Sequence, residues 1–170
     1  MKRRVFFSFH YEKDNWRASQ IRNMGILEGN PPISDNDWES IKREGDKAIQ
    51  NWIESQIKGK TCCIVLIGEE TYRRRWINFE IKLAWKMGLG VLGIYIDGLK
   101  DCDGNTSKVG ANPFSAIRFG SKTLDQIVEA YRPSGEESTS ISKSLNIFYF
   151  ILTFTSEIFI YSLKFKKLWM

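Results

Sequence analysis

The chain has 170 residues, which leaves room for one domain and an appendage but would be cramped for two full domains. Hydrophobic residues make up 42% of it and charged residues 26%, a balance that excludes a disordered chain. The formal net charge of +5 suits nucleotides, nucleic acid or acidic lipid, and equally a basic surface with no specific partner.

The cysteines and the N-terminal residues indicate a cytoplasmic protein without a metal site. Cys62 and Cys63 lie in the apolar run 61–67, where cysteine acts as a small buried residue in a reducing compartment. With Cys102 they make an odd number, and no C-x-x-C pair or histidine cluster accompanies them. The apolar stretch 5–9 is too short for the core of a signal peptide.

The hydrophobic pattern predicts alternating strands and helices. Residues 5–9 are expected to form the first strand, and a helix capped by Asp14 or Asn15 should follow and run to Met24, just before Gly25. The other expected elements are, in chain order, a loop at 29–32, a helix over 46–58, a strand at 62–67, a helix over 76–87, a strand at 91–96, a surface loop at 97–112 and a short helix over 124–131.

Apolar strands that alternate with helices favour an α/β fold, with a parallel sheet covered on both faces. Ligands of such sheets bind outside the carboxyl ends of the strands, where the winding reverses. This rule places residues 9–11, 68–71 and 97–98 at one rim of the sheet. Any active site is expected there.

Three glycines, Gly88, Gly90 and Gly93, match the pattern G-x-G-x-x-G. A dinucleotide fingerprint has these glycines after a strand and at the start of a helix. Here they close a helix and enter a strand, so the order is reversed. Gly88 is better interpreted as a left-handed helix end, and Gly93 as a site of close packing.

The segment 71–81 carries the most informative side chains. On a helix, Trp76 and Glu80 lie one turn apart on the same face. A carboxylate beside an indole can stabilise positive charge on a sugar carbon or hold ribose hydroxyls, and the preceding arginines, Arg75 in particular, could hold a pyrophosphate. The pattern alone is more typical of a surface glutamate paired with an arginine and a tryptophan packed in the core.

Several motifs in matching order resemble the TIR-like family, and within it the Thoeris anti-phage TIR-like proteins of the ThsB type. The resemblance covers residues 3–118, and its motifs are RVFFSFHY at 4–11, Trp38, VLIG at 65–68, YRRRWINFE at 72–80 and NPF at 112–114. It implies a flavodoxin-like fold with Glu80 as the catalytic glutamate and Trp76 four residues before it. Phe9, His10 and Trp38 match the positions that line the pocket of the family.

The same resemblance implies a function. TIR enzymes of this kind cleave the nicotinamide–ribose bond of NAD, and Thoeris members release a cyclised ADP-ribose signal that activates an effector protein. NAD would then be a substrate, with no separate cofactor and no nucleic acid as partner, and TIR–TIR self-association is a further expectation. The alternative is a non-catalytic TIR-like interaction module in which Glu80 is structural.

The end of the chain departs from the family pattern. We expect a TIR-like domain over 1–132, a polar linker over 133–144 and an apolar C-terminal helix over 145–170. Its apolar part, 145–163, would span roughly 28 Å as a helix, just enough for a bilayer core. Because Glu157 offsets most of the apolar gain, the segment is either a membrane anchor or a helix packed on the domain or a partner.

Overall fold

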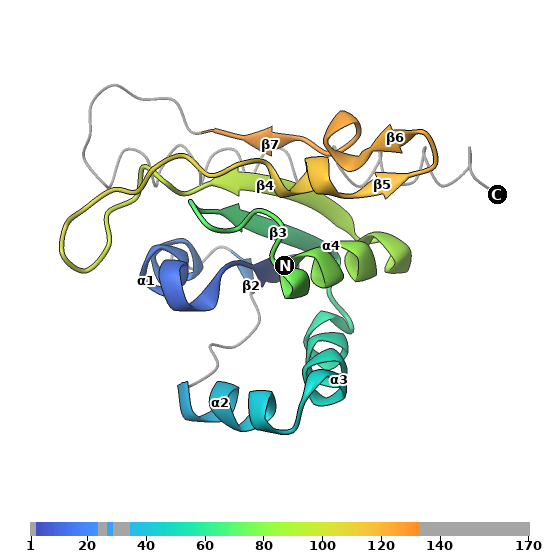
Figure 1. The fold of residues 1–170 in the computed structure, drawn as a ribbon, viewed down its shortest axis with the longest axis horizontal. Coiled ribbons are helices and arrows are strands. Elements are labelled where there is room, and N and C mark those ends of the chain that lie inside the picture. The colour runs from blue at the N-terminus through green and yellow to red at the C-terminus, as the bar shows by residue number, and fades with distance from the viewer. Residues whose placement is uncertain (1–2, 24–26, 29–34, 133–170) are drawn as a thin grey trace.

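The computed structural model describes residues 3–23, 27–28 and 35–132, and a five-stranded sheet forms its centre (Figure 1). All neighbouring strands are parallel. Their order across the sheet is β2 (Leu27–Glu28), β1 (Arg3–Ser8), β3 (Cys62–Ile67), β4 (Gly90–Tyr95) and β7 (Ala130–Tyr131). This is the flavodoxin-like order 2-1-3-4-5, and it confirms the fold class expected from the sequence.

Helices cover both faces of the sheet, because successive residues of a strand point to opposite sides. Phe6 of β1 packs into the core beneath two helices, whereas Val5 and Phe7 join the core on the other face, beneath one helix. The two helices on the Phe6 side are α3 (Asp46–Ile57) and α4 (Arg75–Met87), and the helix on the opposite side is α1 (Tyr11–Arg22).

Most of the central elements lie where the sequence pattern predicts them. The strand at 62–67 is found without a shift, and the expected helices over 46–58 and 76–87 differ from α3 and α4 by one residue at one end. Gly88 ends α4 with a left-handed φ of 76°. A Cβ on Gly93 would lie 2.8 Å from atoms of two core side chains, so the expected packing role is also confirmed.

The start of α1 was wrongly predicted. The helix begins at Tyr11 after His10, and neither Asp14 nor Asn15 caps it. Asp14 is instead buried one turn inside the helix, 3.6 Å from Arg17, with its carboxylate against Gly68. Because a Cβ at Gly68 would come within 2.1 Å of Asp14, the glycine is what lets the carboxylate lie there.

The last expected helix, over 124–131, was also wrong. Only a short 3-10 turn, η2 (Leu124–Gln126), forms, and it buries Leu124 in the core. The chain then extends, since Ala130 and Tyr131 pair with Gly93 and Ile94 as the edge strand β7. The unpaired edge of β4 therefore determines the structure here more strongly than local propensity.

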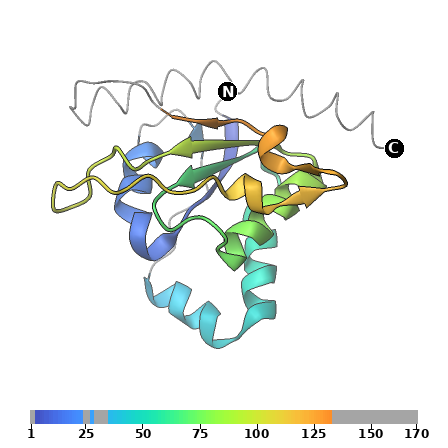
Figure 2. The same cartoon turned by 45° about the horizontal axis from the view of Figure 1, so that its top comes forward.

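The sequence pattern predicted no element at α2 (Asp35–Arg43) or at β2. Helix α2 leads through Gly45, with a φ of 90°, into α3, and the two project from the sheet as a V-shaped pair (Figures 1 and 2). A 3-10 turn, η1 (Pro113–Ala116), and a small hairpin near β7 complete the described fold. The hairpin consists of β5 (Arg118–Phe119) and β6 (Lys122–Thr123).

The expected linker over 133–144 and apolar helix over 145–170 lie outside the described residues. In the described part of the chain, no helix combines the length and the apolar character that crossing a bilayer requires.

Candidate active site

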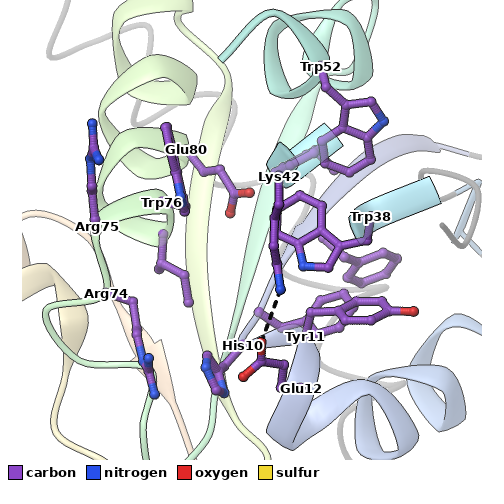
Figure 3. Close-up of a pocket in the computed structure, with 14 residues that line it drawn as sticks. His10, Tyr11, Glu12, Trp38, Lys42, Trp52, Arg74, Arg75, Trp76 and Glu80 are labelled. Atoms are coloured by element: carbon purple, nitrogen blue, oxygen red, sulfur yellow. Dashed lines mark hydrogen bonds and ion pairs between the residues drawn. The ribbon is translucent and has the colours of Figure 1, made fainter. Parts of the chain in front are cut away.

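A pocket of about 320 Å³ opens at the carboxyl end of β1, between α4 on one side and α1, α2 and α3 on the other (Figure 3). Its walls combine aromatic rings with a small number of charged groups. The lining residues are Phe6, Phe7, Phe9, His10, Tyr11, Glu12, Trp38, Lys42, Trp52, Arg74, Arg75, Trp76, Ile77 and Glu80.

Glu80 is the acidic group deepest in this pocket. It lies in the second turn of α4, and its carboxylate points from that helix toward the aromatic side chains opposite (Figure 3). The Ser8 hydroxyl at the end of β1 donates a hydrogen bond of 2.5 Å to Glu80 Oε2. Burial raises the pKa of the Glu80 carboxyl to about 8, and the bond from Ser8 opposes that rise.

Trp76 forms the wall next to Glu80. It lies one turn earlier on α4, is half-buried, and packs edge-to-face on Phe79 with 6.0 Å between the ring centroids. On its other side the Arg75 guanidinium lies 4.7 Å from the indole centroid. The helical spacing predicted from the sequence therefore brings an indole and a carboxylate together in one pocket.

The opposite wall is a row of aromatic rings from three helices. Tyr11 of α1 lies 6.3 Å from Trp38 of α2, which in turn lies 5.7 Å from Trp52 of α3. Lys42 lies over the Trp38 ring at 5.6 Å and is ion-paired with Glu12 of α1 at 3.3 Å. This ion pair joins α2 to α1 on the side of the pocket opposite α4 (Figure 3).

His10 and Arg74 face each other at one end of the pocket. Burial, together with the nearby Arg74 charge, lowers the pKa of His10, which favours a neutral imidazole. Its Nδ1 atom is buried and has no hydrogen-bond partner within residues 3–23, 27–28 and 35–132. Arg74 is exposed and donates to the Glu70 carboxylate at 2.6 Å.

The chain was compared with known protein families. A sequence model described as "Thoeris protein ThsB, TIR-like domain" matches residues 6–101, which is more than half of the chain and includes every residue that lines the pocket. This chain belongs to the ThsB TIR-like family. The resemblance found in the sequence is thereby confirmed.

One curated relative of this ThsB-family chain is the "Putative cyclic ADP-D-ribose synthase ThsB1" of Bacillus cereus (strain MSX-D12). The two are 33% identical over 124 residues, which make up 70% of this chain and 65% of the relative. The chain thus spans less than two thirds of the length of that relative.

All six site residues named from the sequence of this ThsB-type domain line the pocket: Phe9, His10, Trp38, Arg75, Trp76 and Glu80. Their positions differ in kind. Glu80 and Trp76 lie side by side on α4, whereas Phe9 lies at the base of the aromatic row, 6.4 Å from the Tyr11 ring. Arg75 is mostly exposed and already paired with Asp46 of α3 at 2.5 Å, so an anionic ligand would have to share it.

Sequence reasoning missed several residues of the site. Trp52 and Lys42 were not named as site residues, and Tyr11 was placed only at the rim of the sheet, since the helices of all three meet only in the folded chain. Ser8 was missed too, although a signal existed: by strand alternation it shares the face of Phe6, which is covered by α4.

The other segments expected at the same rim do not line the pocket. In the segment 68–71 Gly68 packs against Asp14 instead, and the loop after β4 is tied to α1 by Arg17, which donates to the Leu99 and Asn105 carbonyls. In the part of the chain that the structure describes, no three His, Cys, Asp or Glu side chains come together as a metal site would require.

Proposed function

We propose that this ThsB-family domain breaks the nicotinamide–ribose bond of NAD and closes the ADP-ribose part into a cyclic nucleotide, with Glu80 as the catalytic carboxylate. The observation that carries the proposal is the position of Glu80: a carboxylate deep in an aromatic pocket, with a pKa shifted to about 8. Strongly shifted carboxyls in pockets are typical of functional sites.

The proposed reaction needs only the chemistry that such a pocket offers. The bond between ribose C1′ and the nicotinamide nitrogen breaks, and its electron pair leaves with nicotinamide as a neutral ring. Positive charge then develops on C1′ and the ring oxygen, and the ionised Glu80 stabilises it. A nucleophilic atom of the ADP part bonds to C1′, and the ADP part releases one proton to the solvent; attack by water would give linear ADP-ribose instead.

The remaining walls support a dinucleotide as substrate. The pocket volume of about 320 Å³ lies at the lower end of the range typical of small-molecule sites. The rings of Tyr11, Trp38 and Trp52 offer flat surfaces for planar bases, and Lys42, Arg74 and Arg75 supply positive charge for a pyrophosphate. NAD is the substrate in this proposal, so no separate organic cofactor is required.

The name of the Bacillus cereus relative, a cyclic ADP-D-ribose synthase, supports cyclisation over hydrolysis as the outcome. A cyclic nucleotide is small and diffusible. We infer that it acts as a signal to an effector protein that this chain need not contact, in keeping with anti-phage Thoeris defence.

The test is to incubate the full chain with NAD and identify the products by mass spectrometry. The proposal predicts nicotinamide and a nucleotide that is one water lighter than linear ADP-ribose. The incubation is repeated with extract of phage-infected cells, in case turnover needs a trigger. If NAD stays intact in both, while the chain associates with other TIR-like domains, the rival function as an interaction module replaces this one.

A further inference from the structure

Ser8 lies directly behind Glu80, outside the pocket itself. It is the last residue of β1, is only 1% exposed, and does not belong to the lining residues. Its backbone is fixed in the sheet, since Ser8 pairs with Val65 of β3. Because residues of β1 alternate between faces, its hydroxyl meets α4 rather than α1.

The hydrogen bond between the two residues is isolated. Among the described residues, Ser8 is the sole hydrogen-bond partner of the Glu80 carboxylate. It contacts one oxygen, Oε2. A buried polar hydroxyl at this position therefore satisfies a carboxylate that burial would otherwise leave unpaired.

We propose that Ser8 is a positioning residue for the reaction: its hydroxyl holds Glu80 Oε2 against β1 and leaves Oε1 to face the ribose of the substrate. This inference rests on the proposed function for its consequence in catalysis, but not for the interaction itself. Ser8 acts through Glu80 and touches no reacting atom.

The bond also has an electrostatic consequence. A hydrogen bond donated to a carboxylate stabilises its charged form, which the burial of Glu80 disfavours. The other charged or titratable groups around Glu80 are His10 after β1, Tyr11 and Glu12 on α1, Lys42 on α2, Cys63 on β3, and Arg74 and Arg75 at the start of α4. None of them is a hydrogen-bond partner of the carboxylate within the described residues.

The experiment compares Ser8→Ala and Ser8→Cys with the wild-type full-length chain. Both lose the strong donor, and Cys nearly keeps the volume, so one variant remains informative if the other fails to fold. The midpoint of the pH profile of kcat/KM for NAD should move up by about one pH unit. At pH 7 kcat should fall while KM changes little, because the substrate does not contact Ser8.

Two further variants make the comparison specific. Ser8→Thr keeps a hydroxyl and should keep the wild-type midpoint. Thr71→Val removes another buried hydroxyl, which accepts from the Gly68 N–H and contacts no carboxylate, and should also leave the midpoint unchanged. If both donor-free variants fold and keep the wild-type midpoint and kcat, the positioning role is wrong.

A readout without turnover separates this inference from the proposed function. Carbon-13 NMR of glutamate-labelled chain, with the Glu80 signal assigned by its loss in Glu80→Gln, follows the titration of Glu80 directly. A higher titration midpoint in Ser8→Ala supports the interaction even if the wild-type chain leaves NAD intact, which would overturn only the function. An unchanged titration in an active enzyme would overturn only the role of Ser8.

Discussion

Glu80 is held where its charged form is disfavoured. Its surroundings are largely aromatic, and one hydroxyl is its hydrogen-bond partner within the described chain. A carboxylate kept for structure alone would be expected at the surface or paired with a cation, as Glu12 is with Lys42. The raised pKa of Glu80 therefore has measurable consequences for both activity and stability.

The pH dependence of turnover is the first consequence. The proposed mechanism needs Glu80 ionised, and the pKa of the free enzyme is about 8. We predict that kcat/KM rises with pH, about tenfold per unit below the midpoint, and levels off above pH 8. A steady-state profile between pH 5.5 and 9.5 checks this; a profile that falls toward high pH would mean that the protonated acid is the active form.

Glu80 should also lower the stability of the fold at alkaline pH. Its pKa is near its ordinary value of 4.5 in the unfolded chain and about 8 when folded, so the folded state holds a proton that the unfolded state loses between these values. Below pH 4.5 the neutral carboxyl makes its full contribution to the stability of the folded state, and this contribution is lost as the pH rises to about 8. The Glu80→Gln chain does not lose this stability, because the amide has no proton to lose in this pH range.

The matching measurement is the melting temperature of both chains at pH 5 and pH 9. The gain in Tm from Glu80→Gln should be larger by several °C at pH 9. Asp14 also has a raised pKa, about 6, but it is present in both chains and cancels in the comparison. An equal difference at both pH values would contradict the assigned ionisation.

Single residues differ in how far the sequence could place them. Helical spacing alone puts Trp76 and Glu80 on one face, and the resemblance to the TIR-like family predicted that both belong to the site. The contacts of Ser8 with Glu80 and of Arg75 with Asp46 span 72 and 29 residues, and no local pattern reveals them. Arg75 was predicted to hold a pyrophosphate, yet in the fold it is already ion-paired with Asp46.

At the scale of elements, α2 contributes Trp38 and Lys42 to the pocket although no helix was predicted there. Its nine residues follow a segment with two prolines and include only two large apolar side chains, Trp38 and Ile41, so the apolar stripe is too short to be recognised as a helix. Among the described residues, the Lys42–Glu12 pair is the only ion pair that connects α2 to another element. The position of α2 beside the pocket therefore depends on tertiary contacts, which the local sequence pattern does not reveal.

The aromatic row on α1, α2 and α3 should bind NAD by stacking. Trp38→Ala removes the ring between Tyr11 and Trp52, and we predict an increase in KM of about tenfold, in line with about 1–3 kcal/mol per stacked base. Trp16→Ala is the matched control, since Trp16 on α1 is 56% exposed and lies outside the pocket. An equal increase in KM in Trp38→Ala and Trp16→Ala would contradict a role of the aromatic row in NAD binding.

For the whole molecule, the alternation of apolar strands and helices was enough to predict a parallel sheet covered on both faces, and the resemblance to the TIR-like family implied the flavodoxin-like winding. The central strands were found because they are apolar throughout, and the helices because glycines end them. The edge strands β2 and β7 were not predicted. Each is described over two residues and forms because a neighbouring strand pairs with it.

The pocket is built from residues 6–80, so the C-terminal part of the chain should not be needed for its chemistry. We predict that a chain ending at Arg132 keeps a cooperative thermal unfolding transition and its kcat/KM for NAD. A folded but inactive truncated chain would contradict this. Co-sedimentation of the full and truncated chains with lipid vesicles separates a membrane anchor at 145–163 from a helix packed on the domain.

The central claim is that Glu80 carries the chemistry on NAD, and the most direct test is the rate of nicotinamide release from Glu80→Gln. The amide keeps the shape of the side chain and its contact with Ser8 but cannot stabilise a positive charge. The rate should fall at least about a hundredfold while folding is kept, whereas Glu44→Gln, an exposed change outside the pocket, should match the wild type. A folded Glu80→Gln chain that releases nicotinamide at the wild-type rate would contradict the account.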